Sequence, residues 1–185
     1  PSIRHGYELA AGGRWETWYQ YDILDVAGTP TGETRQDYLL YVKAGTDGLL
    51  GYFADWQVDA QLRYRLSDAN RYLDSISLLD EDSETRTAVA LEGGVGWSPT
   101  RKVNLELGAY GEYTWYRGRE ALDATGSPAG EKLRVVSAGG DVRVDWTSDD
   151  HWYLVLGGSG GYRGANDPEE TRWYASLRGG GEYGF

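Results

Sequence analysis

Apolar and polar residues alternate with a period of two along most of this chain. Residues 49–67 read LLGYFADWQVDAQLRYRLS. From Leu50 to Leu66 every second residue is apolar or aromatic, whereas Asp55, Asp59 and Arg63 lie among the residues between them. Alternation over this length is typical of a β-strand with one apolar and one polar face, and helical spacing is scarce. The pattern therefore predicts an all-β fold.

The same alternation recurs in seven further segments and predicts eight antiparallel strands. They lie at residues 5–23, 37–44, 49–67, 87–97, 102–116, 135–146, 151–163 and 172–185. Residues 71–79 (RYLDSISLL) are the weak point of this count, because a further strand pair there would raise it to ten. We favour eight strands in a single domain that spans residues 1–185, a length that all-β domains commonly reach undivided.

The connections between these strands fall into two alternating classes. Residues 45–48, 98–101 and 147–150 (GTDG, SPTR and TSDD) have the composition of tight hairpin turns. Longer, polar and acidic connections lie at residues 26–33, 67–84, 117–131 and 164–170. We therefore expect one end of the sheet to carry short turns and both chain termini, and the other end to carry four longer loops.

Two closed architectures fit eight such strands. A soluble barrel of the lipocalin kind buries its apolar face, whereas a membrane barrel turns that face outward to lipid. Gly13-Arg14-Trp15 matches the short G-x-W motif near the start of lipocalins, but no second lipocalin signature is found. The distribution of the aromatic residues distinguishes these two architectures.

Seven of the eight tryptophans, all except Trp18, occupy apolar-face positions near strand ends. Trp152 and Tyr162 are ten residues apart, which at ~3.3 Å per residue and a tilt of ~40° spans roughly 25 Å, the height of a lipid-facing band. Aromatic rings gather at membrane–water interfaces, and a soluble core gives no reason for such sorting. We predict that the interface aromatics are Trp56, Trp97, Trp115, Trp146, Trp152, Tyr162, Trp173, Tyr183 and Phe185.

The opposite face carries charges of both signs, which a narrow barrel interior would pair with one another. The predicted lumen-facing residues are Arg14, Glu16, Asp22, Asp55, Asp59, Arg63, Arg65, Arg86, Glu92, Glu106, Glu112, Asp141, Arg143, Asp145, Arg163, Arg172, Arg178 and Glu182. Glycines among them, such as Gly94, Gly108 and Gly157, would make room for long arginine side chains. A solvated outer face of a soluble barrel explains the charges equally well, but it leaves the aromatic sorting unexplained.

Composition narrows the functional classes. The formal net charge is −11, which argues against a nucleic-acid-binding surface. The absence of cysteine excludes disulfides and thiolate metal sites, and no run of 18 apolar residues is present that would form a membrane-spanning helix. The mean hydropathy of −0.58 is typical of a soluble protein, but an average is misleading for an alternating fold. Because the chain begins at Pro1, we expect that any targeting segment has been removed or left out.

The chain ends in GEYGF, with Tyr183 and Phe185 on the apolar face. Together with the alternation, the aromatic sorting and the asymmetric loops, this ending resembles the small Gram-negative outer-membrane β-barrels of the OmpA, OmpX and OmpW kind. The resemblance implies a closed up-and-down transmembrane barrel, integral to the bacterial outer membrane, with loops outside and termini in the periplasm. It also implies contact with outer-membrane lipids and lipopolysaccharide, and recognition of the C-terminal strand by the barrel-assembly machinery.

Catalytic groups are sparse in this sequence. Some outer-membrane barrels are lipid A- or phospholipid-modifying enzymes, most of which use a histidine with a serine or carboxylate. His5 and His151 are the two histidines, and His151 follows Ser148 and two aspartates. Both are expected at the short-turn end, whereas such enzymes mostly work at the outer leaflet. The acidic segments DEDSE (80–84) and NDPEE (166–170) match no spaced calcium-loop motif. No cofactor or metal is expected.

These observations favour a non-enzymatic, monomeric outer-membrane barrel. Its function is expected to be that of a narrow pore for small solutes, or of a structural or surface-binding barrel, because eight strands leave an interior that side chains nearly fill. Carboxylates slightly outnumber arginines on the polar face, which predicts that any conductance prefers cations. The alternatives are a lipid-modifying enzyme, an accessory barrel of an envelope complex and a soluble lipocalin-like carrier.

Overall fold

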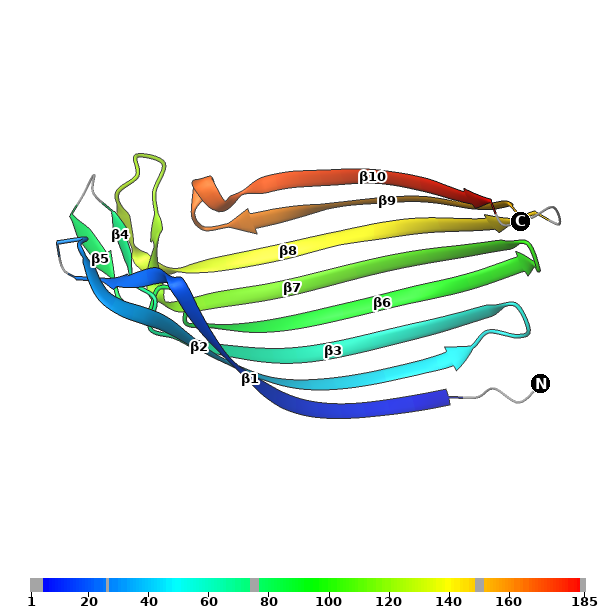
Figure 1. Ribbon diagram of the computed structural model, residues 1–185, viewed down its shortest axis with the longest axis horizontal. Helices are drawn as coiled ribbons and strands as arrows, with labels where there is room; N and C mark the ends of the chain where they lie inside the picture. Colours follow the sequence, from blue (N-terminus) through cyan, green and yellow to red (C-terminus); the bar gives the residue numbers. More distant parts are fainter. Residues whose placement is uncertain (1–4, 26, 74–76, 149–151, 184–185) are drawn as a thin grey trace.

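The computed structural model describes residues 5–25, 27–73, 77–148 and 152–183, without the side chains of residues 19–22 and 78. One antiparallel sheet dominates this structure (Figure 1). Its eight strands are β1 (His5–Leu24), β2 (Pro30–Leu49), β3 (Ala54–Ser67), β6 (Arg86–Thr100), β7 (Val103–Leu122), β8 (Pro128–Thr147), β9 (Trp152–Ala165) and β10 (Arg172–Tyr183). Each strand pairs with its neighbours in chain order. The predicted all-β, up-and-down arrangement is confirmed.

The segment that could have raised the strand count does form a strand pair, but this pair lies outside the main sheet. β4 (Arg71–Leu73) and β5 (Leu78–Asp80) pair only with each other in the described residues. They lie at the end of the main sheet that carries the longer connections (Figure 1). The main sheet therefore keeps eight strands, and β4 and β5 form a separate hairpin beside its loop end.

The sheet is open in the described residues, which differs from the closed barrel expected. β1 and β10 are the first and last strands of the sheet, and no register pairing joins them. They form the two edges of the sheet in Figure 1, with the start of β1 and the end of β10 both at the short-turn end. Each edge strand thus leaves one row of backbone donors and acceptors unpaired within the sheet.

One predicted turn is wrong. Residues 45–48 (GTDG) lie inside β2, where Gly45 pairs with both Glu8 and Asp59. A bend over residues 50–53 reverses the chain instead, and Gly51 in this bend has a positive φ of 88°. The strand predicted over residues 49–67 correspondingly begins only at Ala54. A Cβ built at Gly45 would collide with the Asp59 carboxylate, so this glycine makes room for a neighbouring side chain.

Several longer connections contain more strand than the sequence suggested. β7 and β8 continue to Leu122 and Pro128, so that residues 117–131 are mostly a two-stranded extension with a short turn. The turn is held by Asp123, whose Oδ1 accepts hydrogen bonds from the backbone N–H groups of Thr125 and Ser127 at 2.8 and 3.0 Å. β2 likewise begins at Pro30, inside the segment 26–33 predicted as a loop.

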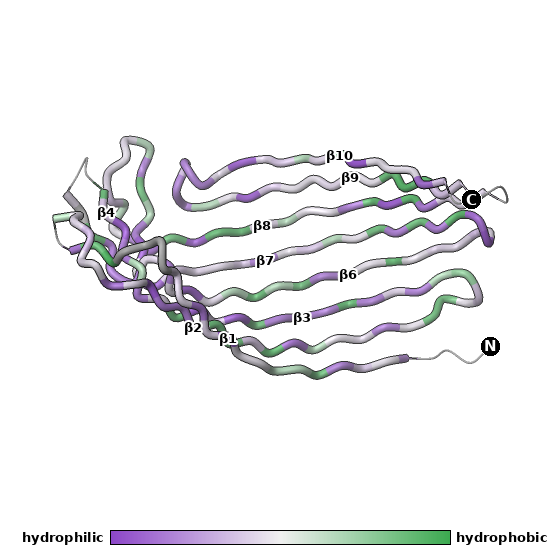
Figure 2. The backbone as a smooth tube through the Cα atoms, in the orientation of Figure 1, coloured by the Kyte–Doolittle hydropathy of each residue, from purple (hydrophilic) through white to green (hydrophobic). Residues whose placement is uncertain are grey.

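Hydrophobic and hydrophilic residues alternate along the strands (Figure 2), and the two faces differ in accessibility. Large apolar-face side chains are exposed, including Leu9 at 80%, Leu107 at 58% and Leu177 at 81%. The described cluster of buried hydrophobic residues lies at the loop end, where Tyr116, Ala121, Leu133 and Val135 pack together. The sheet therefore leaves its apolar face exposed, and no described part of the chain covers it.

Candidate functional site

The polar face is concave, because side chains from strands that are not adjacent meet across it. Arg63 on β3 forms an ion pair with Glu112 on β7, although β6 lies between these two strands. Beneath the pair lie Ala88 and Ala90, the register partners of Arg63 and Glu112, which are only 5% and 4% exposed. Small β6 side chains thus let the two long ones meet.

An arginine-rich zone occupies the half of the polar face nearer the loops. Arg14, Arg65 and Arg86 share one register row, with Leu39 between the first two. Together with Arg63 and their acidic partners, they line a cavity of about 210 Å³. Like charges directly opposite one another repel, so Arg65 and Arg86 need counter-charges.

Those counter-charges are present. Asp37, 1% exposed, forms ion pairs with Arg65 and with Arg35, the latter at 2.9 Å. It also accepts a 2.7 Å hydrogen bond from the Trp18 indole N–H. Arg86 contacts Glu84 at 3.4 Å and donates to the Tyr116 hydroxyl at 2.8 Å. The arginine-rich zone is therefore largely neutralised by its own chain.

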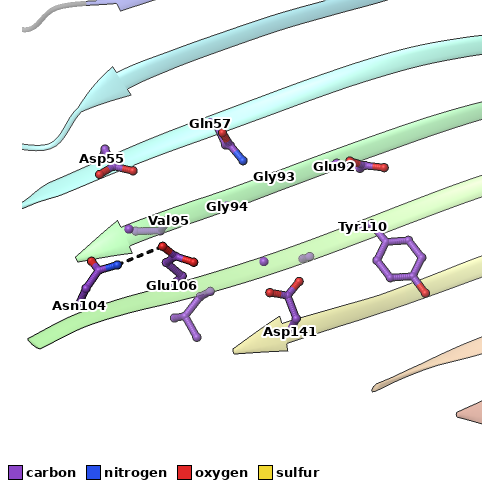
Figure 3. A pocket seen from close by; sticks show the side chains of 14 residues that line it. Asp55, Gln57, Glu92, Gly93, Gly94, Val95, Asn104, Glu106, Tyr110 and Asp141 are labelled. Atoms are coloured by element: carbon purple, nitrogen blue, oxygen red, sulfur yellow. Dashed lines mark hydrogen bonds between the residues drawn. The ribbon is translucent and has the colours of Figure 1, made fainter. Parts of the chain in front are cut away.

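An acidic zone occupies the half of the polar face nearer the short turns (Figure 3). Four carboxylates, those of Asp55, Glu92, Glu106 and Asp141, line a cavity of about 540 Å³ that no lysine or arginine lines. The Asn104 amide donates to Glu106 at 3.0 Å, and no ion pair involves these four carboxylates in the described residues. The two halves of the polar face thus differ in electrostatic character.

The glycines of the polar face accommodate several kinds of side chain, whereas the sequence suggested arginines alone. A Cβ at Gly139 would lie 2.8 Å from the Tyr110 ring, and one at Gly12 would lie 2.7 Å from the Tyr41 hydroxyl. Gly108 similarly faces the Asp141 carboxylate. Among the glycines proposed to make room for arginine, Gly157 does lie beside one, with Arg178 Cγ 3.7 Å from its virtual Cβ.

Other residues of the polar face, most of them predicted from the sequence, form contacts within a strand or between adjacent strands. Lys43 bridges Glu8 and Asp59 at 3.3 and 3.2 Å, and Arg143 contacts Asp145 at 3.0 Å. Arg14 contacts Glu16 at 2.6 Å, and both line the arginine-rich cavity. Arg172, Arg178 and Glu182 lie on the exposed edge strand β10. The side chain of Asp22 lies outside the described residues.

A second ionic cluster lies at the loop end. Glu170, in the short 3₁₀ helix η1 (Pro168–Glu170), accepts hydrogen bonds from Arg119 and, at 3.1 Å, from Arg163. Burial alone would raise the pKa of Glu170, but the charge and hydrogen bond of Arg119 and the charge of Arg163 hold it below its usual range. Asp80 in β5 is 3% exposed, and burial raises its pKa although it accepts from the Glu120 N–H.

Aromatic residues form two belts on the apolar face. The short-turn belt comprises Trp56, Trp97, Trp146, Trp152 and Tyr183; the loop-end belt comprises Trp15, Tyr38, Tyr64, Tyr113, Trp115, Tyr162 and Trp173. Within them Trp152 contacts Tyr183 and Tyr162 contacts Trp173, with ring centroids 4.9 and 4.6 Å apart. Phe185, predicted at the short-turn end, lies outside the described residues.

Both belts run diagonally across the register rows of the sheet. In the short-turn belt, Trp152 pairs with Tyr183 on β10, whereas the rows of Trp146, Trp97 and Trp56 reach β9 at Leu154, Leu156 and Gly158. In the loop-end belt, Tyr162 shares a row with Trp173. The rows of Tyr113, Trp115 and Tyr38 follow in that order, each one row closer to the loops than the row before it. From β10 toward β1 the two belts therefore drift in the same direction.

Sequence reasoning missed some residues that organise the polar face. Asp37 was predicted only as the start of a short strand, yet it forms ion pairs with Arg35 and Arg65 and accepts a hydrogen bond from Trp18. A signal was available, because Asp37 stands on the polar face two residues from Arg35, and Trp18 is the one tryptophan off the apolar face. Tyr41, Tyr110 and Tyr174 were also overlooked, although each follows the same alternation.

The described residues provide no arrangement that supports the catalytic alternative. His151 lies outside the described residues, together with Asp149 and Asp150. His5 packs edge-on against the Trp56 ring, with centroids 6.0 Å apart. In the described part of the chain, no group of three or more histidine, aspartate or glutamate side chains is arranged to hold a metal ion.

No family model matches the chain, no curated protein matches its sequence, and no solved structure matches its fold. Across the described residues, no helix has the length and apolarity needed to cross a membrane.

Proposed function

We propose that this protein is an integral outer-membrane β-barrel, closed by pairing of β1 with β10, whose polar interior is a narrow, cation-preferring conduit for small solutes. The single observation that carries the proposal is the diagonal course of the two aromatic belts. Aromatic rings of a membrane barrel lie at the two lipid–water interfaces, and its strands tilt by 35–45° from the barrel axis.

This tilt predicts how steeply the belts should run across the register rows, and the observed slope agrees with it. With strands about 4.8 Å apart and residues ~3.3 Å apart along them, a level plane should shift by about one residue for each strand crossed. The loop-end belt shifts by three rows, two residues each, between Trp173 on β10 and Trp15 on β1. A soluble core imposes no such shared slope on two separate sets of rings.

Closure of the sheet into a barrel follows from the proposal that the apolar face lies in lipid hydrocarbon. In hydrocarbon each unpaired backbone N–H or C=O costs several kcal/mol, so that an open edge such as β10 cannot persist. The exposed apolar face, including Leu9 and Leu177 at 80% and 81%, is then satisfied by lipid tails. The neutralised arginine-rich zone keeps charges paired in the interior.

Cation preference rests on the acidic zone. The carboxylates of Asp55, Glu92, Glu106 and Asp141 line their cavity without a basic neighbour in its wall, so they favour cations entering from the short-turn end. Nearer the loops, the Arg63–Glu112 and Arg65–Asp37 pairs narrow the proposed conduit. The conduit is therefore suited to small ions, and a wide general pore is disfavoured.

Two measurements test the proposal. Refolded protein should insert into lipid vesicles and should migrate differently on gels before and after heating, as closed barrels do. Planar-bilayer recordings should then give small currents with a reversal potential that favours cations. A chain that stays folded and dispersed in plain buffer refutes membrane insertion, whereas an inserted barrel with no current, or with anion preference, refutes only the conduit.

A further inference from the structure

Three basic residues project from the apolar side of the sheet just beyond the loop-end belt. On β7, Arg117 follows Trp115 by two residues and is exposed. On β8, Arg134 is the register partner of Trp115, and Lys132 lies two residues further toward the loops; both are exposed. Leu133 and Val135, which alternate with them, are 0% and 2% exposed. The basic side chains therefore point away from the core, on the outward side.

The charges of this basic patch are only partly compensated by the chain itself. Arg117 lies over the Tyr64 ring, 5.3 Å from its centroid, and Tyr64 belongs to the belt. Lys132 donates to the Gly118 carbonyl at 2.8 Å and stands 3.8 Å from the Glu120 carboxylate. In the described residues no carboxylate pairs with Arg117 or Arg134. One acid against three bases leaves excess positive charge on a chain whose net charge is −11.

We propose that Arg117, Lys132 and Arg134 form a binding site for the phosphate headgroup of a membrane lipid. The inference rests on the proposed membrane insertion, which puts the belt at the lipid–water interface and the patch at headgroup depth. There the available anions are lipid phosphates, and guanidinium groups match phosphate oxygens in geometry and charge. The rings of Trp115 and Tyr64 would border the lipid's glycerol and upper acyl region.

The test uses the whole chain refolded into vesicles of equal parts phosphatidylcholine and phosphatidic acid. After gentle detergent extraction, native mass spectrometry counts the phosphatidic acid molecules that remain on each protein. The triple variant R117Q/K132Q/R134Q should retain far less of this lipid, because binding is expected to be roughly five-fold weaker for each charge removed, on the order of a hundred-fold for all three. The matched control R14Q/R172Q/R178Q removes the same charge from the polar face and should retain lipid as the wild type does.

Because a triple variant can fail to fold, R134Q serves as a second variant. No described hydrogen bond or ion pair uses the Arg134 guanidinium, so its removal should leave heat-modifiable migration unchanged and still weaken lipid retention. In a further arm with pure phosphatidylcholine vesicles and inorganic phosphate, the wild type should retain no more phosphate than the triple variant.

The outcomes separate this inference from the proposed function. An inserted wild type that retains phosphatidic acid no better than the triple variant overturns the lipid site alone. Equal loss in the control overturns it as well, because the effect is then one of net charge. Retention of inorganic phosphate through the patch assigns the site to free anions and overturns the lipid assignment. A wild type that does not insert overturns both proposals.

Discussion

Arg63 of β3 and Glu112 of β7 form an ion pair across the intervening strand β6, over the small side chains of Ala88 and Ala90. Glu112 also accepts a 2.7 Å hydrogen bond from the Thr114 hydroxyl. The two charged side chains can meet because the β6 side chains between them are small. The size of the residues at positions 88 and 90 therefore controls whether this ion pair forms.

Ala90→Leu should destabilise the protein by about 1–3 kcal/mol, because a leucine at this 4% exposed position overfills the space beneath the pair. The measurement is the free energy of unfolding in urea for protein refolded in lipid vesicles. Ala109→Leu, on the exposed apolar face of β7, is the matched control and should change this free energy by less than about 0.5 kcal/mol. Equal losses in both variants would contradict the arrangement.

Much of the fold could be predicted because alternation reports directly on strands. The eight strands of the main sheet and their up-and-down order follow from it. The turns were less predictable, since glycine serves two purposes here. Gly51 supplies a positive φ in a bend, whereas Gly45 lies in a strand and makes room for Asp59. Sequence composition does not distinguish these roles.

The polar face could be predicted as a set of residues but not as a pattern of contacts. Which acid pairs with which base depends on register across several strands, as Arg63 and Glu112 illustrate. Asp37 was missed because its role comes from Trp18 and Arg65, which are 19 and 28 residues away. The division into an arginine-rich and an acidic zone likewise appears only once the rows are aligned.

Closure of the barrel can be tested by cross-linking, since the chain contains no cysteine. An eight-stranded barrel with the usual tilt returns to its first strand displaced by about eight or ten residues. Continuing the register rows from β10 around to β1 with these displacements pairs Gly179 with Ala11 or Gly13. Oxidised Gly179→Cys should therefore form an intramolecular disulfide with Ala11→Cys or with Gly13→Cys.

The control is Gly179→Cys with Gly12→Cys, whose side chains would project from opposite faces of the closed sheet. It should not cross-link, because an odd displacement would turn the apolar side chains of one strand inward. Reducing and non-reducing gels distinguish intramolecular from intermolecular products. A cross-link between two chains, or none in any pair, would mean that β1 and β10 do not pair as proposed.

Cation preference should depend on the acidic zone. Glu92→Gln with Glu106→Gln removes two of the four carboxylates that line this cavity, and should lower the cation-to-anion permeability ratio measured from reversal potentials in a salt gradient. Glu33→Gln with Glu131→Gln removes the same charge from exposed positions outside the cavity and should leave the ratio near that of the wild type. A ratio that follows net charge alone would remove the acidic zone from the mechanism.

The loop end should respond to acid through Glu170. Its pKa is held below its ordinary value of 4.5, against the effect of burial, by Arg119 and Arg163. A lowered pKa in the folded state means that the stabilisation is present above the ordinary pKa and is lost as the pH falls through the lowered one. Amide hydrogen exchange in the 165–171 segment, followed as the pH is lowered and corrected for the intrinsic exchange rate, should therefore show a loss of protection in acid.

Glu170→Gln should be less protected at neutral pH and should lose much of this acid response, since glutamine has no charge for Arg119 to stabilise. Asp80 should show the opposite pH dependence, because burial raises its pKa. Its contribution to stability is therefore lost as the pH rises through that raised pKa. Asp80→Asn keeps an acceptor for the Glu120 N–H, so it should increase protection of β5 at neutral pH. If both variants shifted protection in the same direction, the assignment of opposite electrostatic roles to these two carboxylates would fail.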